Sequence, residues 1–295
     1  MLNIYIYKKI EGVEHIHILD FYLGQRDFGV SRSGDEAIKL LNKDFFRLVS
    51  DSLEADYLLI PHNYFSIKDR DYINTFVELS KKHNKKIIVF SYGDRSEPID
   101  IPNSIIFRSS VYKAQMKKNE IIMPAISDDL LSDKMLTVLN KNNLPKIGFC
   151  GWAGFDSNWL KAKQYAKSFG TLFKNTPQMK GILFRIEILR RLEKSKLVVA
   201  NFIVRDSFTG NEKTRKGNFE DLRSEFINNI LESDFSLAIK GDGNFSIRFY
   251  EILSLGRIPI FVDTDSVLPL EDIIDYHDFI VRVDYREIRN IDKIV

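Results

Sequence analysis

The chain has 295 residues, of which 44% are hydrophobic, so it can bury a substantial core, which argues against global disorder. Its 43 basic and 41 acidic residues give a formal net charge of +2, which provides no overall field to attract a nucleic acid. No apolar run reaches the roughly 18 residues of a membrane span, so no transmembrane segment is predicted. The single cysteine excludes an internal disulfide.

The first half of the chain alternates between strand and helix patterns. Period-two or continuous apolar runs predict strands at residues 3–7, 57–60, 86–91, 104–108 and 120–124. Apolar residues at helical spacing predict helices at 36–49 and 69–84. This alternation favours a mainly parallel sheet with helices on both faces.

The second half repeats the same alternation after a polar stretch. Residues 128–144 are rich in lysine and asparagine and end at Pro145, so they are the best linker candidate, with a short helix expected at 133–140. Strands follow at 146–150, 197–202, 235–239, 258–262 and 279–283, and helices at 179–194, 218–232 and 247–255. The sequence therefore predicts two α/β lobes, residues 1–135 and 146–295, with a cleft between them.

Residues 233–262 form the most informative segment, because they combine a strand, a glycine loop, a helix and a second strand. The loop Gly241-Asp242-Gly243-Asn244 can adopt positive φ and expose successive N–H groups, and Gly256 stands where the helix should end. A loop of this kind at a helix N-terminus binds anions, and Lys240 and Arg248 add two cations suited to a diphosphate.

Glu251 lies five residues beyond Ser246, about 7.5 Å along a helix axis. That separation suits a carboxylate that accepts hydrogen bonds from the ribose of a nucleotide whose diphosphate sits at the helix start. Alternatively, Arg248 and Glu251 form only a surface ion pair, since they are three residues apart. This geometry suggests a site for a nucleotide diphosphate that serves as the donor in a group transfer. The residues predicted to bind this donor are Lys240, Gly241, Gly243, Asn244, Ser246, Arg248, Glu251 and Arg205.

The same segment resembles the C-terminal signature of exostosin-like glycosyltransferases. The resemblance rests on a basic residue and glycine at 240–241, Ser-x-Arg-Phe-x-Glu at 246–251, Gly-x-x-Pro at 256–259 and Leu268-Pro269. It covers about 60 residues, from about Glu220 to Phe279, and residues 55–61 resemble an upstream strand of the family more weakly. This chain has Ile239-Lys240-Gly241 where the family has Pro-Arg-Gly, and it lacks the family's cysteine in the preceding strand.

The resemblance implies a GT-B fold of two Rossmann-like lobes, an N-terminal acceptor side and a C-terminal donor side. It implies inverting transfer of a hexosyl or pentosyl group from a nucleotide sugar, with UDP as the expected nucleotide, to a glycan or polysaccharide. No cofactor and no metal are expected, because Lys240, Arg248 and the helix dipole supply positive charge. Animal relatives carry a membrane anchor; its absence here suggests a cytoplasmic enzyme of a bacterium or a virus-infected cell.

An inverting transfer also needs a general base for the acceptor hydroxyl. Asp94 follows a glycine in a loop after a predicted strand and is the first candidate; His62, in another such loop, is the second. Each has a structural alternative, Asp94 as a turn residue and His62 as a locally hydrogen-bonded histidine. Arg108 is a candidate acceptor contact, and Asp263-Thr264-Asp265 is expected to be a loop spacer, not a metal site.

Two other functions remain open at this point. One is a GT-B transferase that uses a GDP-sugar, as fucosyltransferases do, although their Tyr-x-Ser/Thr-Glu-Lys pattern is missing here. The other is a non-catalytic nucleotide-binding subunit of a transferase complex. Release of free nucleotide from a donor would separate an enzyme from such a subunit.

Overall fold

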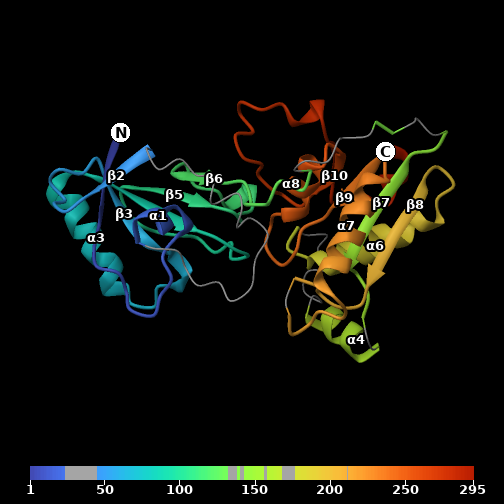
Figure 1. Cartoon of the computed structure of the whole chain (residues 1–295), viewed down its shortest axis with the longest axis horizontal. Coiled ribbons are helices and arrows are strands. Elements are labelled where there is room, and N and C mark those ends of the chain that lie inside the picture. The colour runs from blue at the N-terminus through green and yellow to red at the C-terminus, as the bar shows by residue number, and fades with distance from the viewer. Residues whose placement is uncertain (24–44, 132–137, 140–142, 156–157, 168–176, 211) are drawn as a thin grey trace. The chain divides into compact units, whose positions relative to one another are not determined.

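The computed structural model describes residues 1–23, 45–131, 138–139, 143–155, 158–167, 177–210 and 212–295 (Figure 1). The chain divides into two compact units. Unit 1 consists of Met1–Ile126 and Val267–Leu270, and unit 2 consists of Ser127–Ser266 and Glu271–Val295. Each unit contains a parallel sheet with helices, so the predicted α/β class and two-lobe organisation are confirmed.

The described part of unit 1 forms a six-stranded sheet in the order β2-β1-β3-β4-β5-β6, with every pair parallel. The strands are β1 (Leu2–Ile6), β2 (Phe46–Val49), β3 (Tyr57–Asn63), β4 (Lys86–Ser91), β5 (Ser104–Arg108) and β6 (Glu120–Ile122). The helices described with them are α1 (Asp20–Leu23) and α3 (Arg70–His83).

Both faces of the unit 1 sheet are covered, as the continuous apolar strands predict. Leu58 and Ile60 of β3 pack with Phe76 of α3 in one buried cluster. Leu59, between them in sequence, packs with Leu19 on the other face, because successive side chains of a strand alternate. Asp69 caps the start of helix α3 by accepting the Asp71 N–H, and Asn84, in the left-handed conformation, caps its end.

The helix predicted at residues 36–49 is wrong at its C-terminal end. Residues 46–49 form strand β2, which pairs in parallel with β1 from Leu2 to Tyr5. Pairing with the sheet overrides the helical spacing read from the sequence. The remainder of that prediction up to residue 44 lies outside the described residues, as does most of the short helix expected at 133–140.

The described part of unit 2 forms a five-stranded parallel sheet in the order β11-β10-β9-β7-β8. The strands are β7 (Lys146–Trp152), β8 (Val199–Arg205), β9 (Phe235–Ala238), β10 (Ile258–Asp263) and β11 (Val281–Asp284). The helices are α4 (Asn158–Lys167), α6 (Gly181–Lys194), α7 (Phe219–Leu231), α8 (Ile247–Ser254) and α9 (Ile291–Ile294).

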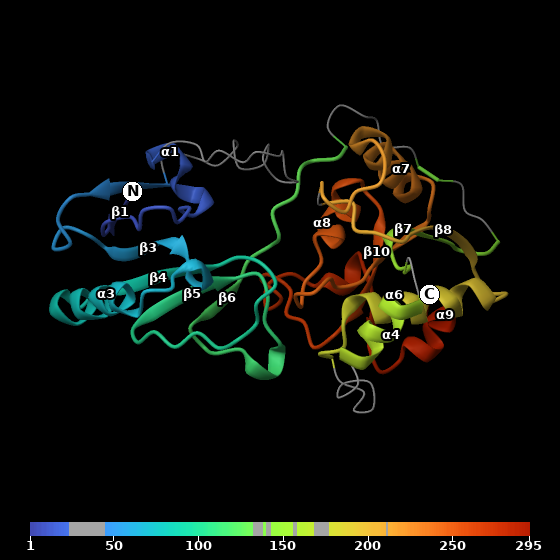
Figure 2. The same cartoon turned by 90° about the horizontal axis from the view of Figure 1, so that it is seen from below.

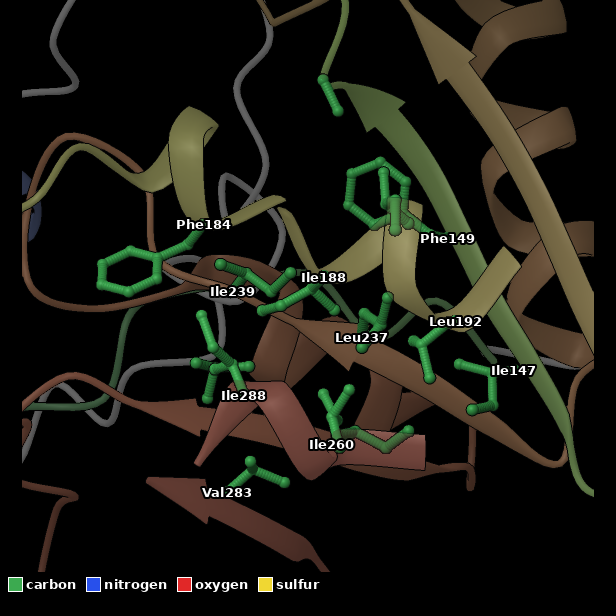
Figure 3. Close-up of a cluster of buried hydrophobic side chains, with 14 of the residues drawn as sticks. Ile147, Phe149, Phe184, Ile188, Leu192, Leu237, Ile239, Ile260, Val283 and Ile288 are labelled. Carbon is green, nitrogen blue, oxygen red and sulfur yellow. The ribbon is translucent and has the colours of Figure 1, made fainter. Parts of the chain in front are cut away.

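Helices lie on both faces of this sheet, α7 and α8 on one face and α6 and α9 on the other (Figure 2). The core on the α6 face is aliphatic and aromatic (Figure 3). There Phe184, Ile188 and Leu192 of α6 face Ile147 of β7 and Leu237 of β9. Of these five side chains none exposes more than 2% of its surface, so α6 is held firmly against the sheet.

Strand β7, the first of unit 2, lies between β8 and β9. The chain therefore leaves β7 in one direction to form β8 and crosses back to form β9 on its other side. In open parallel sheets, ligands bind outside the carboxyl ends of the two strands where the winding reverses in this way. The loops after β7 and β9 are thus the position that the fold offers for a ligand.

Candidate active site

The loop after β9 leads directly into helix α8, as the sequence predicts. Ser246 is the N-cap residue, with extended backbone, and its side chain makes no capping hydrogen bond. Gly256 has φ 62° just after the last helical turn, and its N–H donates to the Leu253 carbonyl. The predicted end of the helix at Gly256 is confirmed.

The glycine loop does not use the positive φ that its glycines permit. Neither Gly241 nor Gly243 has positive φ. Glycine is needed instead where α6 meets this loop, because a Cβ added to Gly181 would lie 2.1 Å from the Lys240 carbonyl oxygen and 2.4 Å from that of Gly241. The first residue of α6 thus fixes the position of the loop by close backbone approach.

Lys240 is 3% exposed, and its ammonium donates to the Pro177 carbonyl at 2.5 Å. Its Nζ also lies 5.8 Å from the centre of the Phe184 ring. Burial lowers the pKa of the Lys240 ammonium to about 8, while the carboxylate of Asp242 acts in the opposite direction. An anion bound near the glycine loop would therefore stabilise the charged form of this buried lysine.

Arg248, in the first turn of α8, extends back to the end of β7. Its Nη2 donates to the Cys150 carbonyl at 2.8 Å, and its guanidinium lies over the rings of Phe149 and Phe226. A Cβ on Gly151 would lie 2.5 Å from that Nη2, so glycine at 151 makes room for the guanidinium. Nη1 is buried and has no hydrogen-bond partner among the described residues. Burial lowers the pKa of Arg248, and Glu251 opposes this effect.

Substituting Gly181 by alanine should disturb this arrangement without touching either cation. The added Cβ overlaps the backbone of residues 240 and 241, so the loop must move away from α6. We expect the affinity for inorganic pyrophosphate to fall roughly tenfold or more, because a displacement of about 1 Å is costly in a charged site. Calorimetric titration measures this loss, and an unchanged affinity would contradict the assigned role of the loop.

Glu251 is buried and does not pair with Arg248. Its Oε1 accepts a hydrogen bond from Nη1 of Arg223, on α7, at 2.8 Å. The alternative of an Arg248–Glu251 surface ion pair is therefore wrong, since Glu251 is only 7% exposed and its cation comes from another helix. The carboxylate is held in one orientation by Arg223, a residue that the sequence did not single out.

The other residues predicted to bind the donor have different surroundings. Ser246 is buried at the start of α8. The Asn244 side chain is engaged with the loop after β10, donating to the Asp265 carbonyl and accepting from Thr264 at 2.7 Å. Arg205 ends β8 and pairs with Glu225 at 2.5 Å, beside a cavity of about 410 Å³ that both residues line. Asn244 thus holds a loop, and Arg205 already has a carboxylate partner.

The two candidate bases of unit 1 differ sharply. Asp94 is exposed in the loop after β4, at the carboxyl end of the sheet. His62 was expected in a loop, but it lies within β3 and is completely buried. Its Nε2 accepts from the Ile10 N–H and its Nδ1 donates to the Glu14 carbonyl, both at 2.9 Å, and burial lowers its pKa. These hydrogen bonds give His62 a structural role, in agreement with the alternative of a locally hydrogen-bonded histidine.

Arg108 and Asp263 both form ion pairs within the protein. Arg108, the candidate acceptor contact, is 1% exposed and forms an ion pair with Glu120 at 2.7 Å, so it is not available to an acceptor. Asp263 binds Arg282 and accepts the Ser266 N–H, so it closes a loop. Among the residues that the structure describes, no group of three or more histidine, cysteine, aspartate or glutamate side chains could hold a metal ion, and no helix could span a membrane.

Arg185 is the main residue of this region that the sequence patterns did not single out. It belongs to α6 and donates to the carbonyls of Trp152 at 3.2 Å and Lys240 at 3.0 Å. A signal was present in the sequence, because its neighbours three and four residues away are Gly181, Ile182, Ile188 and Leu189. An arginine at that spacing lies on the apolar face of its helix.

Unit 2 is thus a doubly wound α/β domain, and Lys240 and Arg248 lie at the switch point of its sheet. Residues 182–295 match the family model of the exostosin GT47 domain. This part of the chain is therefore similar to exostosin-like glycosyltransferase domains, and the two-lobe α/β fold is consistent with GT-B. No curated protein matches the chain.

Proposed function

We propose that the chain is an inverting glycosyltransferase that transfers a hexose or pentose from a UDP-sugar to a glycan or polysaccharide acceptor. One observation carries the proposal: the buried Lys240 and the partly buried Arg248, whose Nη1 is wholly buried, lie at the switch-point loops of a region that matches the exostosin GT47 model. Buried positive charge is costly unless an anion balances it, and the diphosphate of a nucleotide sugar is such an anion.

In the proposed reaction, the acceptor hydroxyl oxygen attacks the anomeric carbon of the sugar. The bond between that carbon and the diphosphate oxygen breaks, and its electron pair leaves with the diphosphate. Lys240 and Arg248 stabilise the charge that develops on the leaving group, so no metal is required in this scheme. The hydroxyl proton passes to a general base, for which we propose Asp94 because its carboxylate is exposed at the end of a strand.

We assign Glu251 to the ribose hydroxyls of the donor. Arg223 fixes one oxygen of the carboxylate at 2.8 Å and thereby orients the group before the donor binds. Glu251→Gln should weaken UDP binding roughly tenfold or more, since a charged acceptor is worth about 1.5–3 kcal/mol. Calorimetry measures this, with Glu187→Gln as the matched control because Glu187 pairs with Arg190 and Arg191 of its own helix. Equal UDP affinity in wild type and Glu251→Gln would remove the ribose assignment.

The reaction itself is tested by incubating the full chain with a panel of nucleotide sugars and following the release of free nucleotide. We expect release from a UDP-sugar, increased by a suitable glycan acceptor. Preferred release from a GDP-sugar would replace the proposed donor. Binding of a nucleotide without release from any donor, across a broad acceptor panel, would favour a non-catalytic subunit and contradict the proposal.

A further inference from the structure

Arg185 crosses from α6 to the ends of two neighbouring strands. Its Nη1 donates to the carbonyl of Trp152, the last residue of β7. Its Nη2 donates to the carbonyls of Ile239 and Lys240, just after β9, at 3.4 and 3.0 Å. A single planar guanidinium therefore links the two loops between which the winding of the sheet reverses.

The charge of Arg185 is not balanced by the protein around it. Among the described residues, no carboxylate lies within ion-pair distance of Arg185 or of Arg248. The Nε of Arg185 and the Nη1 of Arg248 are both buried, and neither has a hydrogen-bond partner within the described part of the chain. Asp242, an exposed loop residue, is the acidic group close enough to act on Arg185 and Lys240.

The pKa of Arg185 reflects the same situation. Burial, together with the positive charge of Arg248, lowers the pKa of its guanidinium to about 9. The energy spent on burying neighbouring like charges would be recovered when a polyanion binds among them. Positive charges arranged in advance around a ligand position are typical of sites that stabilise developing negative charge.

We propose that Arg185 is a positioning residue of the donor site: it fixes the spacing of the loops after β7 and β9 and adds a third positive charge, beside Lys240 and Arg248, for a diphosphate. This inference rests on the proposed function, because the diphosphate is that of the proposed donor. It adds a residue that lies on α6, outside the strand–loop–helix segment where the sequence placed most of the site.

The test compares Arg185→Gln, Arg185→Lys and the control Arg190→Gln in the full chain. Arg190 lies on the same helix but is exposed and pairs with Glu187. Affinities for UDP and for inorganic pyrophosphate are measured by calorimetry, and melting curves are recorded for each protein without ligand. Pyrophosphate isolates the anion from the nucleoside, so it reports on the charged part of the site alone.

Arg185→Gln should lower the affinity for pyrophosphate and for UDP roughly tenfold or more, because the variant loses the positive charge and the charge-assisted hydrogen bonds of the guanidinium. Arg185→Lys should recover part of this loss through its charge but not all, because an ammonium cannot link both loops in the same plane. Arg190→Gln should bind as the wild type does. If Arg185 only stabilised the fold, Arg185→Gln or the milder Arg185→Lys would melt earlier and bind both ligands normally, which would overturn the inference.

Ligand binding by the wild-type protein distinguishes a failure of this inference from a failure of the proposed function. Failure of the wild type to bind UDP, any other nucleoside diphosphate or pyrophosphate would contradict the donor site itself, and the inference with it. Binding by the wild type with equal affinity in the Arg185 variants would leave the proposed function standing and overturn only the role given to Arg185.

Discussion

Arg248→Ala is expected to lower kcat by about 100- to 1,000-fold, the range found when one preorganised donor to a developing charge is removed. The guanidinium is held by the Cys150 carbonyl and by the rings of Phe149 and Phe226, so it needs no reorganisation when the leaving diphosphate gains charge. The KM for the donor should rise much less than kcat falls, because the interaction strengthens mainly in the transition state.

Steady-state kinetics with a UDP-sugar measure this effect, and Arg190→Ala serves as the control because Arg190 is an exposed arginine on α6. Loss of the Arg248 side chain also leaves the Cys150 carbonyl without its donor, so melting curves are needed to confirm that the variant is folded. A folded Arg248→Ala variant with normal kcat would contradict the role of Arg248 in departure of the diphosphate.

Glu120→Gln is expected to destabilise unit 1 by about 3–5 kcal/mol, the cost of breaking a buried ion pair by removing one partner. Both side chains of the Arg108–Glu120 pair are 1% exposed, and the Glu120 carboxylate also accepts the Lys117 N–H at 3.0 Å. Without the carboxylate, the positive charge of Arg108 would remain buried and uncompensated. Chemical denaturation, followed by a probe within unit 1, measures the change in the free energy of unfolding.

The pair Arg95–Glu97 provides a control in the same unit. Its side chains are 57% and 55% exposed, so Glu97→Gln should cost no more than about 1 kcal/mol. Similar losses for Glu97→Gln and Glu120→Gln would mean that burial does not govern the energy of these pairs. The ion pair of Arg108 also explains why this residue is unavailable to an acceptor.

The sequence predicted most of the elements because both sheets are built from short apolar runs between helices of regular spacing. Residues 57–60, 86–91 and 104–108 form strands almost as expected, and helices α6, α7 and α8 begin and end within about two residues of prediction. Residues 46–49 could not be predicted as a strand, because what decides their structure is parallel pairing with β1, about 44 positions earlier in the chain.

The site was harder to predict than the fold, since residue type does not show burial or partner. His62 and Arg108 have chemistry suited to an active site, yet both are buried and bonded within unit 1. Arg185 and Arg223 donate hydrogen bonds to residues 28 or more positions away in the sequence, namely Trp152, Lys240 and Glu251. Lys240, Arg248 and Glu251 could be singled out because they share one short segment with the glycine loop.

The most direct test of the account is an experimental structure of the full chain with bound UDP. We expect the diphosphate oxygens to lie within hydrogen-bond distance of Lys240 and Arg248, and the ribose hydroxyls to contact the carboxylate of Glu251. UDP bound elsewhere, with the loops after β7 and β9 empty, would contradict it.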